Sequence, residues 1–177
     1  MRAIIAVAGA TIVGCNSNPS TTGNGANGGD GTPAYGIFSG HLDLHGEIAV
    51  HGTFTDTLTS RRETCRAYVG GAVPATTLWV VPTPSNASPV GGHVVTLTGG
   101  VPTDQPSSGY HGPGTYAQPS AAVAVLIVDN ASFLPGNDAR VSITVSPDGS
   151  GSMSFTGMVD TSTSAAESGE ERWTCKG

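Results

Sequence analysis

The stretch ARVSITVSPDGSGSMSFTGMV, residues 139–159, decides the fold class. Apolar and polar residues alternate on both sides of Pro147-Asp148-Gly149-Ser150, a sequence typical of a tight turn. Alternation with a period of two places the apolar side chains on one face of a strand. We therefore expect two antiparallel strands, Ala139–Ser146 and Ser152–Val159, joined as a hairpin.

Short alternating runs recur along the chain, separated by turn residues about every eight to twelve positions. We find no stretch with the 3.6-residue apolar period of an amphipathic helix. These patterns predict an all-β domain with little helix: an antiparallel β-sandwich or barrel-like sandwich of about 8–9 short strands. The other expected strands are Ile37–Leu44, Ile48–Phe54, Thr64–Val69, Thr77–Val81, His93–Thr98, Ala122–Val128 and Glu170–Lys176.

Three polar segments between these runs are expected to be surface loops. Pro82–Gly92 and Gly99–Pro119 are rich in Pro, Gly and Ser, and Thr161–Gly169 precedes the last expected strand. Loops as long as the first two are usually functional or mobile in a small domain, and the sequence leaves open which applies.

The N-terminus has the layout of an export signal. Met1-Arg2 precedes an uncharged, mostly apolar run of eleven residues, Ala3–Val13, whereas a membrane-spanning helix needs about 20. A run of this length suits the apolar region of a secretory signal peptide. It ends in Ile12-Val13-Gly14-Cys15, which resembles the lipobox of bacterial lipoproteins. That resemblance implies cleavage before Cys15 and attachment of lipid to its thiol, which would hold the protein to a membrane.

Residues 16–32 contain Gly, Asn, Ser and Thr but no large apolar side chain, so they cannot bury enough surface to offset chain entropy. We expect a flexible tether here. The predicted organisation is a signal peptide over residues 1–14, the lipidated Cys15 and tether over 15–32, and one β-domain over 33–177.

The charge of the chain is low and acidic. Asp and Glu number 13 against 7 Lys and Arg, and charged residues make up 11% of the chain, compared with about 25% in ordinary soluble domains. Such a composition is common in extracellular β-proteins. With no basic patch, nucleic-acid binding is disfavoured.

Two cysteines remain once Cys15 is assigned to lipid. An even pair in an exported protein predicts a disulfide, here between Cys65 and Cys175. It would close a loop of about 110 residues, worth roughly 4–5 kcal/mol in the chain-entropy model.

Histidines and an aspartate gather on the polar face of the first expected hairpin. If His45-Gly46-Glu47 forms the loop, Leu44 lies opposite Ile48, and His41 lies directly opposite His51 with Asp43 next along. Two imidazoles and a carboxylate on one face could bind Zn²⁺ or Cu²⁺. The alternative is an ordinary solvent-facing strand surface.

The segment Gly109-Tyr110-His111-Gly112-Pro113-Gly114-Thr115-Tyr116 is the most unusual in composition. Its tyrosines Tyr110 and Tyr116 offer flat amphipathic surface of the kind that ligand-binding sites favour. The alternative is a structured turn whose tyrosines cover one end of the sandwich.

Motifs for catalysis are not found. The chain has no G-x-S-x-G elbow, phosphate-binding loop, dinucleotide fingerprint or H-E-x-x-H pair. Asp104, Ser107, Ser108 and His111 are close in sequence, but closeness within a Pro/Gly-rich loop does not define a triad. We expect a non-enzymatic protein without catalytic residues or a resident cofactor.

The whole chain resembles small surface lipoproteins of bacteria, especially those of actinobacteria, and is similar in plan to the mycobacterial 19 kDa lipoprotein antigen type. The resemblance rests on the lipobox, the tether, a cysteine in an early strand, the Gly-Tyr-x-Gly-Pro-Gly-Thr-Tyr segment, Asp148–Ser152 before Phe155, and the terminal Trp173-Thr174-Cys175. It implies a cell-envelope location with the membrane as a partner, and it transfers no catalytic residue.

Three functions stay open at this point. The first is a non-catalytic binding or structural module whose partner is an envelope macromolecule or a small ligand. The second is a carrier or sensor of a small apolar ligand or a metal ion. The third and weakest is an envelope hydrolase. The sequence does not indicate the oligomeric state.

Overall fold

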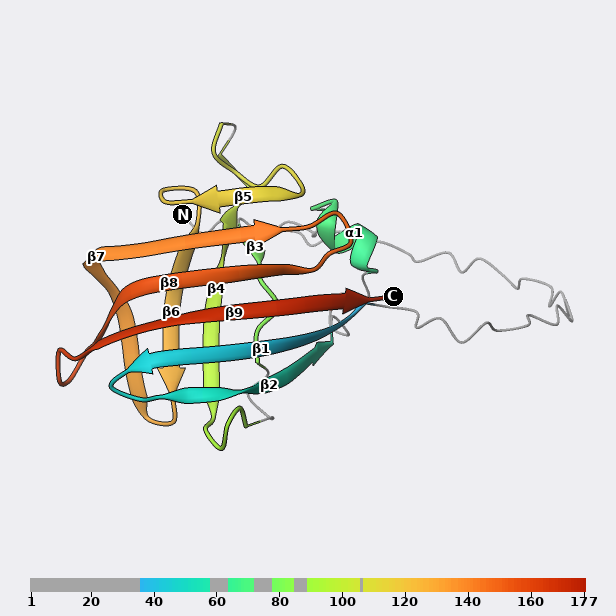
Figure 1. The fold of residues 1–177 in the computed structure, drawn as a ribbon. Helices are drawn as coiled ribbons and strands as arrows, with labels where there is room; N and C mark the ends of the chain where they lie inside the picture. Colours follow the sequence, from blue (N-terminus) through green and yellow to red (C-terminus); the bar gives the residue numbers. More distant parts are fainter. Residues whose placement is uncertain (1–35, 58–63, 72–77, 85–88, 106) are drawn as a thin grey trace, which may run out of the picture. The chain divides into compact units, whose positions relative to one another are not determined.

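Nine strands and one short helix make up the regular structure of the computed structural model, which describes residues 36–57, 64–71, 78–84, 89–105 and 107–177 (Figure 1). The expected all-β fold with little helix is confirmed. In the described part of the chain, no helix has the length and apolar character needed to cross a membrane. The elements are β1 (Ile37–Gly46), β2 (Val50–Thr57), α1 (Cys65–Val69), β3 (Leu78–Val80), β4 (Val95–Pro102), β5 (Gly114–Ala117), β6 (Ala122–Val128), β7 (Ala131–Val145), β8 (Gly151–Asp160) and β9 (Ala166–Lys176).

The strands form one antiparallel sheet that curls over itself. Its order is β2-β1-β9-β8-β7-β6-β4-β3, and β5 pairs with β7 beside this path. In Figure 1, β1, β2, β8 and β9 lie along roughly the same axis, with paired strands antiparallel, and β4 and β6 cross behind them. This arrangement is the barrel-like form of the expected sandwich, in which two halves of one sheet face each other across the core.

The long strand β7 carries the sheet from one half to the other. Its first residues, 131–133, pair with β6, and residues 133–135 and 140–145 pair with β8. The pairing with β8 shifts between Pro135 and Arg140. Such an irregularity bends a strand and increases its twist, which lets a single strand belong to both halves. The expected hairpin around Pro147–Ser150 follows directly and joins β7 to β8.

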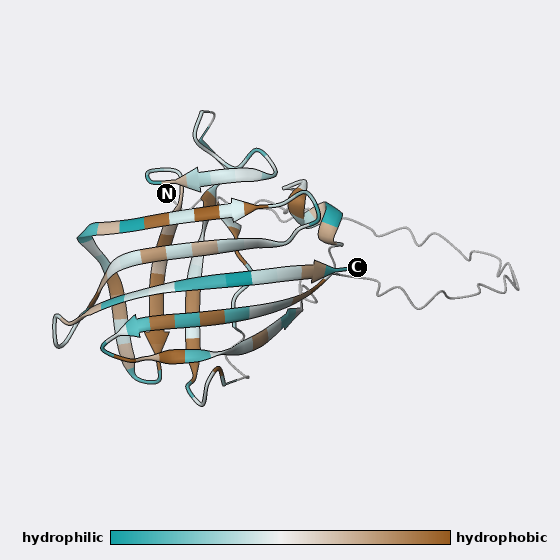
Figure 2. Ribbon diagram, viewed as in Figure 1, coloured by the Kyte–Doolittle hydropathy of each residue, from teal (hydrophilic) through white to brown (hydrophobic). Residues whose placement is uncertain are grey.

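The core lies between the two halves of the curled sheet. Brown, apolar residues follow β4 and β6, and they alternate with hydrophilic ones along β1 (Figure 2). On β1 the inward side chains Phe38, Leu42 and Leu44 are at most 1% exposed. From the opposite half, Trp79 of β3 and Leu126 of β6 are fully buried. Alternation on the strands therefore separates an apolar inner face from a polar outer face.

The strand expected over Thr64–Val69 is wrong, because this segment forms α1. Thr64 caps the helix, and its hydroxyl accepts a hydrogen bond from the Ala67 amide at 3.2 Å. Tyr68 and Val69 pack into the core on one side of the helix. Five residues are too short to show a helical period, and the β-branched ends of the segment mimic a strand. Cys65 accordingly begins a helix and does not lie in an early strand.

The segments expected to be loops contain more strand than predicted. β4 runs on to Pro102, and β5 lies within the segment 99–119. β9 begins at Ala166, inside the expected loop 161–169, and β7 begins eight residues before Ala139. The sequence pattern predicted loops at these positions because they contain glycine and proline, which are depleted in strands and are typical of turns.

Candidate functional site

His41, Asp43 and His51 come together on the outer face of β1 and β2, as the sequence predicts. One ligand atom from each residue, a ring nitrogen or a carboxylate oxygen, lies within 4.8 Å of the others. Nε2 of His41 is 3.2 Å from one oxygen of Asp43, and Nδ1 of His51 is hydrogen bonded to the other. The two imidazole rings meet edge to face, with centroids 4.6 Å apart. Asp43 therefore stands between two imidazoles.

The register that forms this cluster differs from the predicted one. Asp43 lies opposite His51, and His41 lies opposite Thr53; direct opposition of His41 and His51 is wrong. The turn is two residues longer than assumed, because Leu44 pairs with Val50 and the Ile48 amide donates to the Glu167 carboxylate at 3.0 Å. A shift of two residues keeps every side chain on the same face of the sheet. His41, Asp43 and His51 therefore still lie together on the outer face, although the predicted register is wrong.

The surroundings of Asp43 favour its ionised form. The hydrogen bond from His51 holds the pKa of Asp43 below its ordinary value, and the neighbouring His41 adds to the effect. The Asp43 side chain is 30% exposed, and those of His41 and His51 are 37% and 78% exposed. The cluster is thus an anionic carboxylate flanked by two accessible ring-nitrogen donors.

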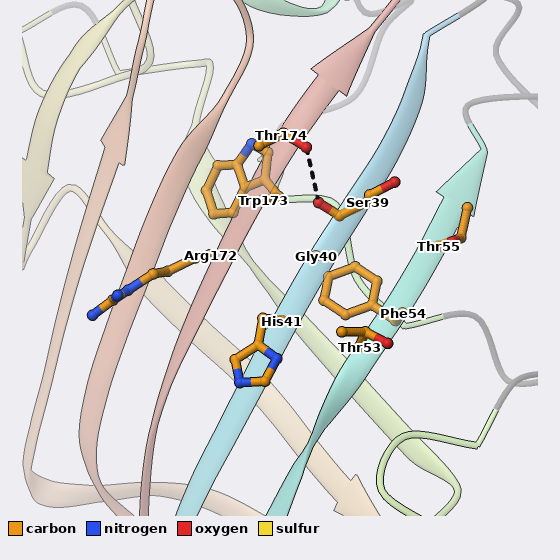
Figure 3. A pocket seen from close by; sticks show the side chains of 9 residues that line it. All are labelled: Ser39, Gly40, His41, Thr53, Phe54, Thr55, Arg172, Trp173 and Thr174. Carbon is orange, nitrogen blue, oxygen red and sulfur yellow. Dashed lines mark hydrogen bonds between the residues drawn. The ribbon is translucent and has the colours of Figure 1, made fainter.

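A groove of about 530 Å³ opens on the outer face next to the cluster (Figure 3). It crosses β2, β1 and β9, and His41 belongs both to its wall and to the cluster. Arg172 of β9 lies across from His41 in the strand register. The lining residues are Ser39, Gly40, His41, Thr53, Phe54, Thr55, Arg172, Trp173 and Thr174. Hydroxyl groups and two basic side chains therefore border an open depression.

The local sequence pattern does not indicate the β9 side of this groove. Arg172 and Thr174 alternate with the buried Trp173, so the period of two places them on the outer face. However, nothing local indicates that β9 pairs with β1, from which it is separated by more than a hundred residues. The pairing Gly40↔Trp173 needs long-range information that a single sequence does not contain.

Tyr110 and Tyr116 form part of an aromatic stack. The Tyr110 ring stacks on Trp79 with centroids 4.3 Å apart, and the Tyr116 ring lies 5.5 Å from Tyr110. The Tyr110 hydroxyl donates to the Val69 carbonyl at 2.8 Å, and burial raises the pKa of Tyr110. Tyr116 is 3% exposed. The geometry corresponds to the structured-turn interpretation, in which both tyrosines close one end of the core.

Cys65 and Cys175 form the expected disulfide, with Cα atoms 5.9 Å apart and a sequence separation of 110. It joins the start of α1 to the end of β9. Cys15, the predicted lipidation site, lies outside the described residues, as do the predicted signal peptide and tether.

The loop residues considered for a hydrolase do not form a triad. The Ser108 hydroxyl donates to the Gln105 side chain at 2.5 Å, and the His111 ring faces the Gly109 carbonyl at 3.2 Å. Within residues 36–57, 64–71, 78–84, 89–105 and 107–177, no serine hydroxyl is hydrogen bonded to a histidine ring; Ser168 donates to the backbone carbonyl of His45 at 2.9 Å. The nucleophile–base contact that acyl-transfer chemistry needs is thus not formed by these residues.

No protein-family model, curated protein or solved structure matches this chain.

Proposed function

We propose that this protein is an extracytoplasmic, lipid-anchored binding module that is not an enzyme and that recognises its ligand on the outer face of the sheet. Three features support the anchor and the location: the lipobox-like Ile12–Cys15, the polar residues 16–32 that follow it, and a disulfide, which persists in oxidising compartments.

The observation that carries the binding proposal is the groove over β2, β1 and β9. Its rim hydroxyls come from Ser39, Thr53, Thr55 and Thr174, and they are joined by the His41 ring and the Arg172 guanidinium. Such a set can donate and accept hydrogen bonds along an oxygen-rich chain. The inner face is filled mainly by aliphatic and aromatic side chains packed together, which favours recognition at the surface over carriage of an apolar molecule inside.

We therefore assign a polysaccharide of the cell envelope as the ligand class. A sugar polymer presents rows of hydroxyl groups and needs no large apolar pocket. The acidic net charge of −6 disfavours polyanions such as nucleic acids, whereas a neutral or weakly charged glycan meets no such repulsion.

Anchoring is tested by Cys15→Ser. The variant should move from the membrane fraction to the soluble extracytoplasmic fraction, because lipid attachment needs the thiol. Ser17→Ala, a change in the tether, serves as the matched control and should stay with the membrane. Sedimentation of Cys15→Ser with membranes would show that the anchor assignment is wrong.

Glycan binding is tested separately by co-sedimentation of the Cys15→Ser chain with purified cell-wall sacculi. We expect the chain to pellet and Thr55→Trp, which fills the groove, to remain in the supernatant. Thr156→Trp on the exposed outer face of β8, outside the groove, is the control and should pellet like the parent. Equal sedimentation of both tryptophan variants, or none by the parent, would contradict binding in the groove.

A further inference from the structure

We infer that His41, Asp43 and His51 form a binding site for a divalent transition-metal ion, with Cu²⁺ held more tightly than Zn²⁺. This inference rests on the cluster alone and does not depend on the lipid anchor or on glycan binding.

The spacing of the donor atoms suits an ion at their centre. In a tetrahedral site with ligand distances of about 2.0–2.1 Å, neighbouring ligand atoms lie about 3.3 Å apart. Nε2 of His41 and the nearer oxygen of Asp43 already lie 3.2 Å apart. The three ligand atoms span no more than 4.8 Å. The His51 side chain is 78% exposed, so its ring has room to turn toward an ion shared with His41 and Asp43.

The backbone that carries the donors is fixed by packing. Leu42 and Leu44 flank Asp43 and point into the core, and Val50 precedes His51 in the same way. These inward side chains are at most 2% exposed, so each donor projects from a strand that cannot rotate. Such preorganisation is what a metal site needs from its scaffold.

The donor set selects the class of ion. Imidazole nitrogens suit zinc and copper, whereas magnesium and calcium prefer sites made of oxygen alone. Two imidazoles and one carboxylate occupy three positions and leave a fourth for water or an exogenous ligand. Because His41 also lines the groove, a ligand in the groove lies next to the metal position. Affinity at nitrogen and oxygen sites rises from Zn²⁺ to Cu²⁺.

The charges around the cluster are compatible with a cation. Asp43 contributes carboxylate oxygens to the cluster, and Glu170 lies across from it on β9. The cationic Arg172 is 75% exposed and ion-paired with Glu170 at 3.1 Å. The positive charge of Arg172, which lies across from His41 on β9, is therefore partly neutralised by Glu170.

The test is a calorimetric titration of the full chain carrying Cys15→Ser with ZnCl₂ and with CuCl₂, after removal of bound ions by a chelator. We expect one site per chain for each ion. His51→Ala and Asp43→Asn should each weaken binding more than tenfold, because even the loss of an outer-shell partner costs about 10–100-fold. Both side chains are on the outer surface, so circular dichroism should show an unchanged fold.

His45→Ala is the matched control. His45 lies on the same outer face of β1, two residues beyond Asp43, but it does not belong to the cluster. Its substitution should change the affinity less than twofold. A loss at His45 equal to that at His51 would overturn the ligand assignment.

Imidazole NMR gives an independent reading, since the chain has five histidines. A first equivalent of Zn²⁺ should shift the ring signals of His41 and His51 and leave those of His45, His93 and His111 in place. Equal broadening of all five at this ratio would mean adventitious binding and would overturn the proposal.

Discussion

Glu171 is fully buried on the inner face of β9, and in the described part of the chain neither of its carboxylate oxygens has a hydrogen-bond partner. Burial raises the pKa of Glu171 well above its ordinary value of 4.5, and the carboxylate of Asp56 adds to the shift. A buried carboxyl group without a partner destabilises a core, because its lost hydration is not replaced. The buried carboxyl group of Glu171 is therefore expected to lower the free energy of unfolding.

We predict that Glu171→Met raises the free energy of unfolding by about 1–3 kcal/mol near neutral pH. Methionine fills a similar volume without a polar atom. The exposed Glu170→Gln is the control and should change stability by less than about 0.5 kcal/mol. Urea unfolding of both variants against the parent measures the difference, and a Glu171→Met protein less stable than the parent would mean that the carboxyl group has a favourable role.

The gain from Glu171→Met should grow with pH. The unfolded chain releases the Glu171 proton near the ordinary pKa of 4.5, whereas the folded chain keeps it to higher pH. Between those two values the folded state binds more protons, so the parent loses stability as pH rises. Carboxyl groups with lowered pKa, such as Asp129 and Asp160, act in the opposite sense but equally in both proteins. Unfolding curves at about pH 4 and about pH 8 should therefore diverge, and parallel curves would contradict the assignment.

Glu171 could have been found from the sequence, but only through its neighbours. Trp173 and Cys175 lie at alternate positions along β9, and apolar residues at alternate positions of a strand commonly face the core. Extending that alternation backwards puts Glu171 on the inner face and Glu170 and Arg172 outside. The three consecutive residues Glu170-Glu171-Arg172 are all charged, so no local pattern indicates that one of them is buried.

At the scale of paired strands, Gly40 and Phe54 form an interlocked unit. They lie opposite each other in the β1–β2 register. A Cβ atom added to Gly40 would lie 2.1 Å from Cζ of the Phe54 ring. The ring therefore covers the space that a side chain at position 40 would occupy, and the absence of that side chain lets an aromatic residue fill the inner face.

Gly40→Ala should lower the free energy of unfolding by about 1–3 kcal/mol, the usual cost of overpacking a core. Ser39→Ala, on the exposed face of the same strand, should change it by less than about 0.5 kcal/mol. The double variant Gly40→Ala/Phe54→Leu should recover part of the loss, because the shorter side chain makes room. Strictly additive losses in this cycle would show that the two positions are not coupled.

Local alternation predicted most strands and the outer-face positions of His41, Asp43 and His51, because burial on one face has a strong period of two. It did not predict the register. The turn length depends on the contact between Ile48 and Glu167, which are 119 residues apart. The same limit explains α1 and β5: the first is held by a cap and the second by pairing with β7, and neither has enough residues for a period of its own.

At the scale of the whole molecule, the sequence predicted the class of fold but not the order of strands. β1 pairs with β9 and β3 pairs with β4, so the two ends of the sheet path are β2 and β3. The groove at the outer face exists only because β9, the last strand, lies beside β1, the first. The His41, Asp43 and His51 cluster was predictable because one hairpin supplies all three residues. Arg172 was not, because it lies beside His41 only through the long-range pairing of β1 with β9.

The disulfide is the covalent counterpart of that long-range pairing. It links Cys65 at the start of α1 to Cys175 at the end of β9. It lies between two glycines, since a Cβ atom added to Gly36 or Gly149 would approach its atoms to 3.1–3.4 Å. The bridge therefore joins α1 to the C-terminal strand and packs closely against Gly36, just before β1, and Gly149 in the β7–β8 turn.

Loss of this bridge should destabilise the whole molecule cooperatively. Closing a loop with a sequence separation of 110 is worth roughly 4–5 kcal/mol in the chain-entropy model. The double variant Cys65→Ser/Cys175→Ser should accordingly melt well below the parent, and reduction of the parent should reproduce the shift. A reductant added to the double variant is the control and should have no effect. If the reduced parent melts at the same temperature as the oxidised protein, the bridge does not contribute measurably to stability. The pairing of β1 with β9 would then be sufficient to hold the C-terminal strand in place.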